Sequence, residues 1–349
     1  MILDPILDLF RGKAVTVPPL DGAFRPNTRL DAADCAARVS EPVDMAVRHG
    51  TLLVASGNAV HAVDKDGETS VFASFTAPVS ALAVSADGQV AVGLDTGALH
   101  LDGVAVALPA EVRSITELTF AQDGSLLIAN GSARHRPSEW RVDLMEKGAS
   151  GSVWTVPKDG PARRIAGDLA WPQGLLVVGD DVVVSESWRR RLIRISIPSG
   201  AISVVVSNIP GYPGRISRDG EGALLSVFAP VNRLIEFVLQ EDDYREAMMA
   251  EIAPEFWIAP TLASGRSFLE PLQCGGIKTM GIHKPWAPSR SYGLLVRLDG
   301  DLQPVDSYHS RADGRRHGIV AAVTLGETIY AASAGGDEIL ALARNPEIG

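Results

Sequence analysis

The segment VSALAVSADGQVAVGL, at positions 79–94, contains two short alternating strands joined by an Asp-Gly turn. A related pattern precedes it as VDMAVRHGTLLVAS at 43–56, and another follows it as ITELTFAQDGSLLIAN at 115–130. Glycine accepts the positive φ that tight hairpins require. Each of the three segments is therefore predicted to form a β-hairpin.

Further short strands follow these hairpins, so we interpret each repeat as a unit of four strands. Equivalent positions in the first three units are Asp44, Ser80 and Thr116, which are spaced 36 residues apart. A fixed period of this length with four strands per unit is typical of propeller blades. A parallel α/β fold would need amphipathic helices between the strands, and the first 230 residues contain almost none. The sequence therefore predicts an all-β protein, a single six-bladed β-propeller spanning residues 1–349.

Three more blades complete the predicted ring, and they begin near Pro172, Pro213 and His317. The sixth blade has no outer strand after it in the sequence. The segment AVTV at 14–17 could supply this strand from the N-terminal side. Closing the ring with one end of the chain would remove exposed strand edges, which favour aggregation.

Three segments do not fit the repeat. Residues 131–150 form a small insertion in blade three, and residues 230–291 form a longer insertion in blade five. The longer insertion begins with amphipathic helical spacing and continues as a Gly/Pro-rich stretch. Because a long loop in a compact domain is usually functional, we expect it to form a lid over the channel. Residues 1–13 have one-sided helical spacing and are expected to dock on their own domain.

The composition of the chain indicates which binding partners and which cellular compartment to expect. The net charge of −10 disfavours nucleic acid and anionic membranes, which are themselves densely negative. The chain has no run of 18 apolar residues, so no membrane-spanning helix is expected, and its first residues lack the features of a secretory signal. Two distant cysteines, Cys35 and Cys274, form no disulfide framework and suit buried thiols in a reducing compartment. We therefore expect a cytoplasmic protein with a small-molecule substrate; the sequence does not define its oligomeric state.

Several ordered stretches resemble the strictosidine-synthase-like and SMP-30/gluconolactonase-like propellers. They are VVVSESWRRRLIRISI at 182–197, SNIPGYPGRIS at 207–217, the helical start of the blade-five insertion, and YGLLVRLDGDLQPVDSYHS at 292–310. Propellers of this superfamily bind small molecules at the central channel, often over a divalent cation that is usually calcium. The resemblance therefore implies a pocket formed at the start of each inner strand.

The resemblance also implies candidate ligands for a cation. Calcium prefers six to eight oxygen ligands, several of them carboxylates, and Glu41, Asp44 and Gln173 could supply some of them. Arg215 departs from the family pattern, which has Asp-Asn after the proline where this chain has Gly-Arg. A guanidinium in the channel would repel a cation and could itself occupy the place of the metal. Bound Ca²⁺ and a metal-free channel both remain open.

Other residues are candidates for catalysis or substrate binding. Asp44, Glu117 and His317 could act as general acids or bases. Arg215 is interpreted either as a clamp for an anionic substrate or as a structural ion-pair partner of nearby acids. The remaining substrate-binding candidates, two of which follow from the channel position and three from the blade-five insertion, are Gln173, Asn130, Trp257, Trp286 and His283.

Three functions follow from these residues. The first is a lactonase-like or esterase-like hydrolase that acts in the central channel. The second is a metal-independent lyase, isomerase or condensing synthase of strictosidine-synthase-like type. Val320 stands where that synthase has its catalytic glutamate, which argues against the synthase reaction itself. The third is a propeller that only binds a ligand or protein.

Overall fold

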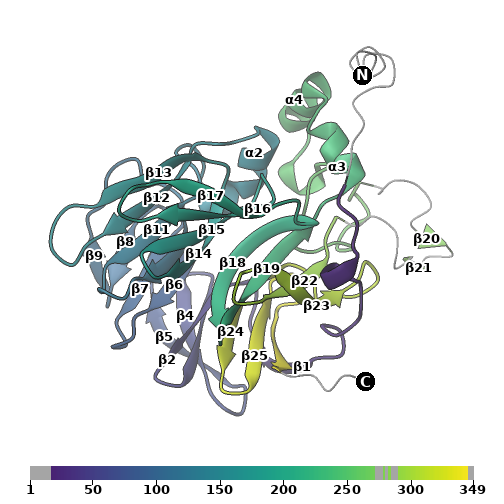
Figure 1. Ribbon diagram of the computed structural model, residues 1–349. Helices are drawn as coiled ribbons and strands as arrows, with labels where there is room; N and C mark the ends of the chain where they lie inside the picture. The colour runs from purple at the N-terminus through teal and green to yellow at the C-terminus, as the bar shows by residue number, and fades with distance from the viewer. Residues whose placement is uncertain (1–16, 272–277, 280–281, 284–289, 345–349) are drawn as a thin grey trace.

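The computed structural model describes residues 17–271, 278–279, 282–283 and 290–344. Its strands form six four-stranded antiparallel sheets around a common axis (Figure 1). The innermost strand of each sheet contacts that of the next, and the innermost strand of the sixth contacts that of the first. The predicted six-bladed propeller is therefore confirmed.

The blades follow the predicted order, and their strands run outward from the axis. The strands of blades one to three are β2 (Pro42–Arg48), β3 (Thr51–Ser56), β4 (Ala59–Val63), β5 (Thr69–Ser74), β6 (Val79–Val84), β7 (Val90–Leu94), β8 (Leu99–Leu101), β9 (Val104–Val106), β10 (Ile115–Phe120), β11 (Leu126–Asn130), β12 (Gly151–Val156) and β13 (Arg163–Leu169). Those of blades four to six are β14 (Pro172–Val178), β15 (Asp181–Glu186), β16 (Arg191–Ser196), β17 (Ile202–Val206), β18 (Gly211–Asp219), β19 (Gly222–Pro230), β22 (Gly293–Leu298), β23 (Pro304–Ser310), β24 (Ile319–Leu325), β25 (Thr328–Ser333) and β26 (Glu338–Ala343).

An N-terminal strand closes the sixth blade, as expected, but a different segment forms it. The outer strand is β1 (Asp34–Arg38), which pairs with β26 through the partners Cys35 and Leu340. The expectation that residues 14–17 supply this strand was wrong; residues 14–16 lie outside the described residues. Cys35 is exposed on this outer strand, which corrects the expectation of a buried thiol, and Cys274 lies outside the described residues.

Hydroxyl groups on the first and second strands of the blades join neighbouring blades. Ser185 in blade four donates to the carbonyl of Gly214 at 2.5 Å, and Ser226 in blade five donates to the carbonyl of Val320 at 3.1 Å. Thr116 joins blades three and four in the same way, through the carbonyl of Pro172 at 2.6 Å. Buried backbone oxygens between blades need such donors, because an unpaired one costs free energy.

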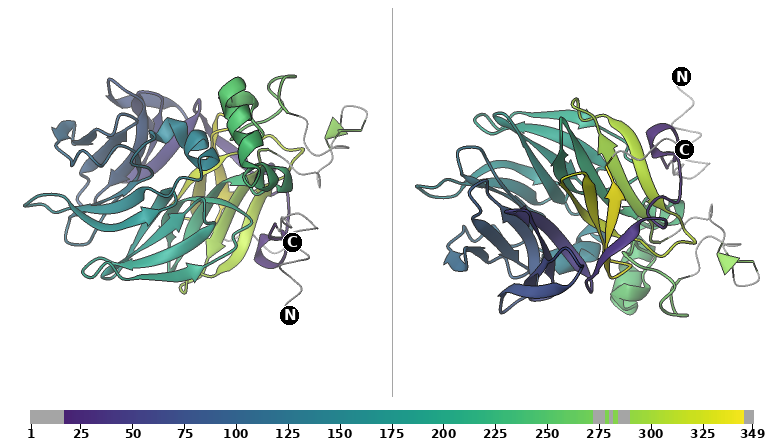
Figure 2. Two further views of the ribbon diagram at one scale, coloured as in Figure 1. Left: turned by 90° about the horizontal axis from the view of Figure 1, so that it is seen from above. Right: turned by 90° about the horizontal axis from the view of Figure 1, so that it is seen from below.

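The two insertions contain all the α-helices that the structure describes. The blade-three insertion contains η2 (Pro137–Glu139) and α2 (Trp140–Met145); the blade-five insertion contains α3 (Arg233–Val238), α4 (Asp242–Glu251), η3 (Pro254–Phe256) and a hairpin of β20 (Lys278–Thr279) and β21 (Ile282–His283). Figure 2 shows α2 beside the helices of the longer insertion. A shared core of Met145, Val238, Met248, Trp257 and Ala259 holds the two insertions together.

None of the helices in the described ranges is both long enough and apolar enough to cross a membrane.

Candidate functional site

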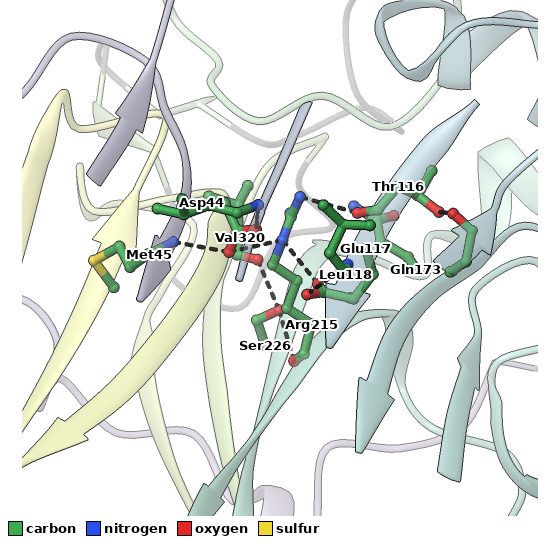
Figure 3. Close-up of polar contacts among 12 residues, drawn as sticks. Asp44, Met45, Thr116, Glu117, Leu118, Gln173, Arg215, Ser226 and Val320 are labelled. Atoms are coloured by element: carbon green, nitrogen blue, oxygen red, sulfur yellow. Dashed lines mark hydrogen bonds and ion pairs between the residues drawn. The ribbon is translucent and has the colours of Figure 1, made fainter. Parts of the chain in front are cut away.

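Arg215 lies at the centre of the channel and contacts three other blades (Figure 3). It projects from β18, the inner strand of blade five, and only 6% of it is exposed. Its Nε lies 3.0 Å from Oδ1 of Asp44 in blade one and 3.0 Å from Oε2 of Glu117 in blade three. Its Nη2 donates to the carbonyl oxygens of Ser80 at 2.6 Å and Thr116 at 3.0 Å. The three positions that the 36-residue spacing made equivalent, 44, 80 and 116, therefore all contact this one side chain.

The two carboxyl groups beside Arg215 differ in how they are held. Asp44 accepts hydrogen bonds from the backbone N–H groups of Met45 at 2.8 Å and Leu82 at 2.7 Å. Burial nevertheless raises the pKa of Asp44, although Arg215 opposes this shift. Burial and the neighbouring Asp44 raise the pKa of Glu117 well above its usual value. One guanidinium and one carboxylate balance in charge when Glu117 keeps its proton, so we assign the proton of this cluster to Glu117.

This arrangement does not fit a calcium ion at the channel centre. A cation there would need the Asp44 and Glu117 oxygens that already face the guanidinium, and it would be repelled by Arg215. Within the described ranges, no group of three or more His, Cys, Asp or Glu side chains is placed to hold a metal ion. Glu41 is separate from the cluster, since its side chain is 76% exposed and faces Arg266 at 4.0 Å.

A cavity of about 660 Å³ opens over Arg215. That volume lies in the range of small-molecule sites, roughly 300–1,000 Å³. Its polar lining near the axis includes Arg215, Ser80, Thr116 and Gln173. The apolar lining is larger and comes from the blades and from both insertions: Pro42, Val43, Pro78, Val79, Trp140, Trp171, Phe228, Phe256, Leu262, Ala263, Val320 and Ala334.

Two residues at the start of inner strands reach this cavity through an uncommon backbone conformation. Glu41 precedes β2 with φ of 42°, and Trp171 precedes β14 with φ of 57°. Non-glycine residues in this left-handed region are held there by their surroundings and cluster at functional sites. Both side chains line the cavity, so these two turns contribute to its shape.

An aromatic cluster fixes the wall formed by the blade-three insertion. Trp171 and Trp188 stack with ring centroids 5.3 Å apart, and Trp140 meets Phe228 edge-on at 5.4 Å. The Trp188 indole N–H donates to Oδ1 of Asp143, on helix α2, at 2.8 Å. Rings packed in this way contribute both buried area and a defined geometry, so the insertion is held against blades four and five.

The other predicted substrate-binding residues have varied positions. Gln173 lines the cavity, and its Oε1 accepts from the Trp171 indole N–H at 3.0 Å. Asn130 is buried away from the cavity, where its Oδ1 accepts from the backbone N–H groups of Arg113 and Ser114. Its role in the structure is to hold the start of the neighbouring strand.

Of the three blade-five insertion residues expected to bind substrate, only Trp257 has a described side chain, and it does not line the channel cavity. Trp257 packs in the core shared by the two insertions and donates to the carbonyl of Ile252 at 2.8 Å. His283 lies in the small β21 strand, and Trp286 lies outside the described residues. The aromatic wall consists instead of Trp140, Trp171, Phe228 and Phe256, which the sequence did not single out as site residues because their convergence depends on how the insertions dock.

The structure places His317 away from the Arg215 cluster. Its Nδ1 lies 2.7 Å from Oγ of Ser291, and its Nε2 lies 2.8 Å from the carbonyl oxygen of Arg311. The following residue, Gly318, has φ of 62° and turns the chain into β24. His317 therefore lines a second cavity beside blade six rather than the channel cavity.

The fold and the cavity define a class: a six-bladed propeller with a small-molecule-sized cavity over its axis. Comparison with known proteins agrees with this class. The chain is 24% identical to strictosidine synthase-like 6 of Arabidopsis thaliana over 273 residues, or 75% of this chain. It spans 60% of the length of that curated relative. No model of a known protein family matches the chain.

Solved structures share the fold at low sequence identity. A gluconolactonase from Xanthomonas campestris aligns with a TM-score of 0.58 and 16% identity over 95% of this chain and 99% of its own. Regucalcin from Agrobacterium tumefaciens, described as a calcium-binding protein, aligns with a TM-score of 0.54 and 15% identity over 88% and 93% of the two chains. The chain thus shares the six-bladed propeller fold of these structures and is similar in sequence to a strictosidine synthase-like protein, in line with the resemblance of its motifs.

Proposed function

We propose that the protein is a small-molecule hydrolase of lactonase or esterase type that works in the channel cavity without a metal at the channel centre. The observation that carries this proposal is the position of the Arg215 guanidinium, which lies at the axis between two carboxyl groups and lines the cavity. A guanidinium there can donate a hydrogen bond to a carbonyl oxygen and stabilise the charge that develops on it.

The charge balance of the cluster favours a neutral carbonyl over an anion. Asp44 already compensates the charge of Arg215, and Glu117 is neutral because it holds the proton of the cluster. Among the described residues, Nη1 of Arg215 has no assigned hydrogen-bond partner, whereas Nη2 bonds to two carbonyl oxygens and Nε faces both carboxyl groups. We therefore assign Nη1 to the substrate carbonyl, and we prefer this role to the anion clamp that the sequence suggested.

Glu41 is the carboxylate that we assign to activation of the attacking water. It lines the cavity, its side chain is largely exposed, and its nearest cation, Arg266, is 4.0 Å away. The cavity has three other acids in its lining: Asp95 accepts from Ser138, Glu270 accepts from backbone N–H groups, and Glu255 interacts electrostatically with Arg141. No hydrogen bond among the described residues engages the Glu41 carboxylate, so its oxygens can accept one from a water molecule in the cavity.

The mostly apolar and aromatic lining indicates the substrate class. Such a wall favours an ester or lactone with a hydrophobic body over a sugar lactone, whose hydroxyl groups would lose water where they face the apolar part of the lining. The similarity to a gluconolactonase supports the reaction type. We propose that this chain differs from that protein in preferring a hydrophobic substrate.

A condensing or isomerising enzyme is the second candidate, because the curated relative is named strictosidine synthase-like. Val320, which stands where the synthase has its glutamate, lines the cavity with an apolar side chain. A reaction of this class would have to use Glu41 or Glu117 in its place.

The test is a hydrolysis assay by proton release with D-glucono-δ-lactone and with γ- and δ-lactones of increasing alkyl chain length. We expect the alkyl lactones to be preferred. We expect Glu41→Gln to lower kcat by about 10²–10⁴-fold, the usual contribution of a positioned base, with an unchanged melting temperature. Glu68→Gln, at an exposed hairpin turn, is the matched control. If none of the lactones or matched esters is hydrolysed, or if Glu41→Gln retains full activity, the proposal is wrong.

A further inference from the structure

A second cavity of about 900 Å³ lies beside blade six and is not used by the proposed channel reaction. The loop 311–316, the end of β1, and the segment 263–266 of the blade-five insertion line it. Ala263 and Arg266 also line the channel cavity, so this segment separates the two spaces. Ser264 and His317 both line the second cavity.

Three side chains form a continuous hydrogen-bonded chain at this cavity. The hydroxyl groups of Ser264 and Ser291 are 2.6 Å apart. The Ser291 hydroxyl lies 2.7 Å from Nδ1 of His317, and Nε2 of His317 lies 2.8 Å from the carbonyl oxygen of Arg311. Ser264 is half-buried at the cavity, whereas Ser291 is completely buried.

The carbonyl of Arg311 sets the direction of this chain. A carbonyl oxygen can only accept, so Nε2 of His317 carries the hydrogen of that bond. In the neutral imidazole, Nδ1 is then the acceptor, and it receives the hydrogen bond from the Ser291 hydroxyl. The Ser291 oxygen can in turn accept from the Ser264 hydroxyl, whose own oxygen lies at the cavity.

The surroundings hold His317 in this orientation. Its backbone carbonyl accepts from the Ser333 hydroxyl at 2.9 Å and from the N–H of Gly335 at 3.0 Å. Its ring stacks on Tyr292 with centroids 6.4 Å apart and an interplanar angle of 20°. A base fixed in one tautomer and one orientation is what activation of a serine hydroxyl requires.

The cavity is rich in arginine although the chain as a whole is acidic. Five arginines line it against three acidic residues: Arg38, Arg266, Arg311, Arg315 and Arg316, with Asp31, Asp313 and Glu338. Nε of Arg311 is buried without a hydrogen-bond partner, and its nearest acid, Asp313, is 3.9 Å away. This excess of cationic donors fits a substrate that carries a negative charge.

We propose that Ser264 is the nucleophile of a second site, which transfers or hydrolyses the acyl group of small esters carrying a carboxylate. Oγ of Ser264 attacks the ester carbonyl carbon while its proton passes to Ser291, whose own proton passes to Nδ1 of His317. Collapse of the tetrahedral adduct breaks the ester bond, and the leaving alkoxide takes the proton back along the same chain. Water then attacks the acyl-serine by the same route and releases the acid, which restores all three side chains.

The first experiment detects the acyl-serine directly, by intact-protein and peptide mass spectrometry after incubation with 4-nitrophenyl hydrogen succinate. The neutral ester 4-nitrophenyl butyrate is the matched probe. We expect a succinyl group on Ser264, formed faster than the butyryl group, and no adduct there in Ser264→Ala. Ser267→Ala, three residues away on the same segment, is the control and should label as the wild type does. Because the readout is a mass at Ser264, it is independent of any hydrolysis in the channel cavity.

Two further variants test the relay. Ser291→Ala and His317→Gln should slow labelling of Ser264 by about a hundred-fold, within the usual range for a positioned base. Thermal unfolding of each variant distinguishes loss of the relay from loss of the fold. Arg315→Gln, at an exposed position that no ion pair in the described ranges engages, should reduce the preference for the succinyl ester. The proposal is overturned if Ser264 is not labelled, or if a folded Ser291→Ala variant labels it at the wild-type rate.

Discussion

Nε of Arg215 lies 3.0 Å from Oδ1 of Asp44, and this contact joins blade five to blade one across the channel. The same guanidinium reaches Ser80 in blade two and both Thr116 and Glu117 in blade three. Its contacts therefore link four of the six blades at the axis. A side chain in this position both supports the ring and lines the cavity, so its structural role and its proposed role in substrate binding must be separated experimentally.

Arg215→Met should destabilise the protein by about 3–5 kcal/mol, because it leaves buried carboxyl groups without their cation. Urea unfolding followed by tryptophan fluorescence measures this loss. Arg218→Met, at an exposed position on the same strand, is the matched control and should cost little. The triple variant with Asp44→Asn and Glu117→Gln should recover much of the stability, since no unpaired charge then remains. An Arg215→Met variant as stable as the wild type would contradict this account of the cluster.

Glu117 should make stability fall as the pH rises. Its folded-state pKa is raised, so the folded protein holds this proton more tightly than the unfolded chain does. Stability from this group is therefore full at low pH and is lost as the pH rises from the unfolded pKa through the folded one. Glutamine imitates the protonated carboxyl, so Glu117→Gln should gain stability relative to the wild type as the pH rises above the ordinary glutamate pKa of about 4.3.

Melting temperatures at several pH values test this prediction, with Glu111→Gln as the control at an exposed glutamate of the same blade. If the difference in melting temperature between Glu117→Gln and the wild type stays constant with pH, the prediction is wrong.

We expect His309 to have the opposite effect, so that the stability of the protein falls as the pH becomes more acidic. It is fully buried between Ser307 Oγ at 2.8 Å and the Tyr292 hydroxyl at 3.1 Å, and burial lowers its pKa to about 4. The unfolded chain then binds the proton first as the pH falls, so stability decreases from about pH 6.5 toward pH 4. The loss approaches about 3 kcal/mol at the end of this range. His309→Gln should flatten this part of the pH–stability curve, and an unchanged slope would exclude His309 as its source.

The repeat in the sequence was sufficient to predict the ring and the axis. The 36-residue spacing aligned Asp44, Ser80 and Thr116, and these positions do meet around Arg215. The closing strand was harder to predict, because residues 14–17 and the actual strand Asp34–Arg38 are both short segments that precede blade one in the sequence. Composition alone does not show which of the two segments forms the outer strand, because this depends on pairing with β26.

The cavity walls could not be predicted from blade spacing. Trp140 and Phe256 reach the cavity only because two insertions dock on the ring, and docking depends on contacts between residues far apart in sequence. His317 shows the same limit in another way. It precedes an inner strand, as channel residues do, but the left-handed turn at Gly318 and the adjacent Leu262 segment place it in a different cavity.

That segment provides the last prediction, which concerns how the blade-five insertion is held. The backbone of Leu262 lies against Gly335 so closely that an added Cβ would overlap the Leu262 carbonyl and lie 2.9 Å from the His317 carbonyl. Gly335→Ala should therefore displace the segment around Leu262, since backbone atoms on both sides cannot yield as a flexible side chain would. Because this segment lines both cavities, its displacement should expose residues 252–271 to protease and raise KM for channel substrates. Gly300→Ala, where an added Cβ has an open environment, is the control. Limited trypsin digestion with mass mapping measures the first effect, and wild-type digestion kinetics in Gly335→Ala would show that this contact does not hold the insertion in place.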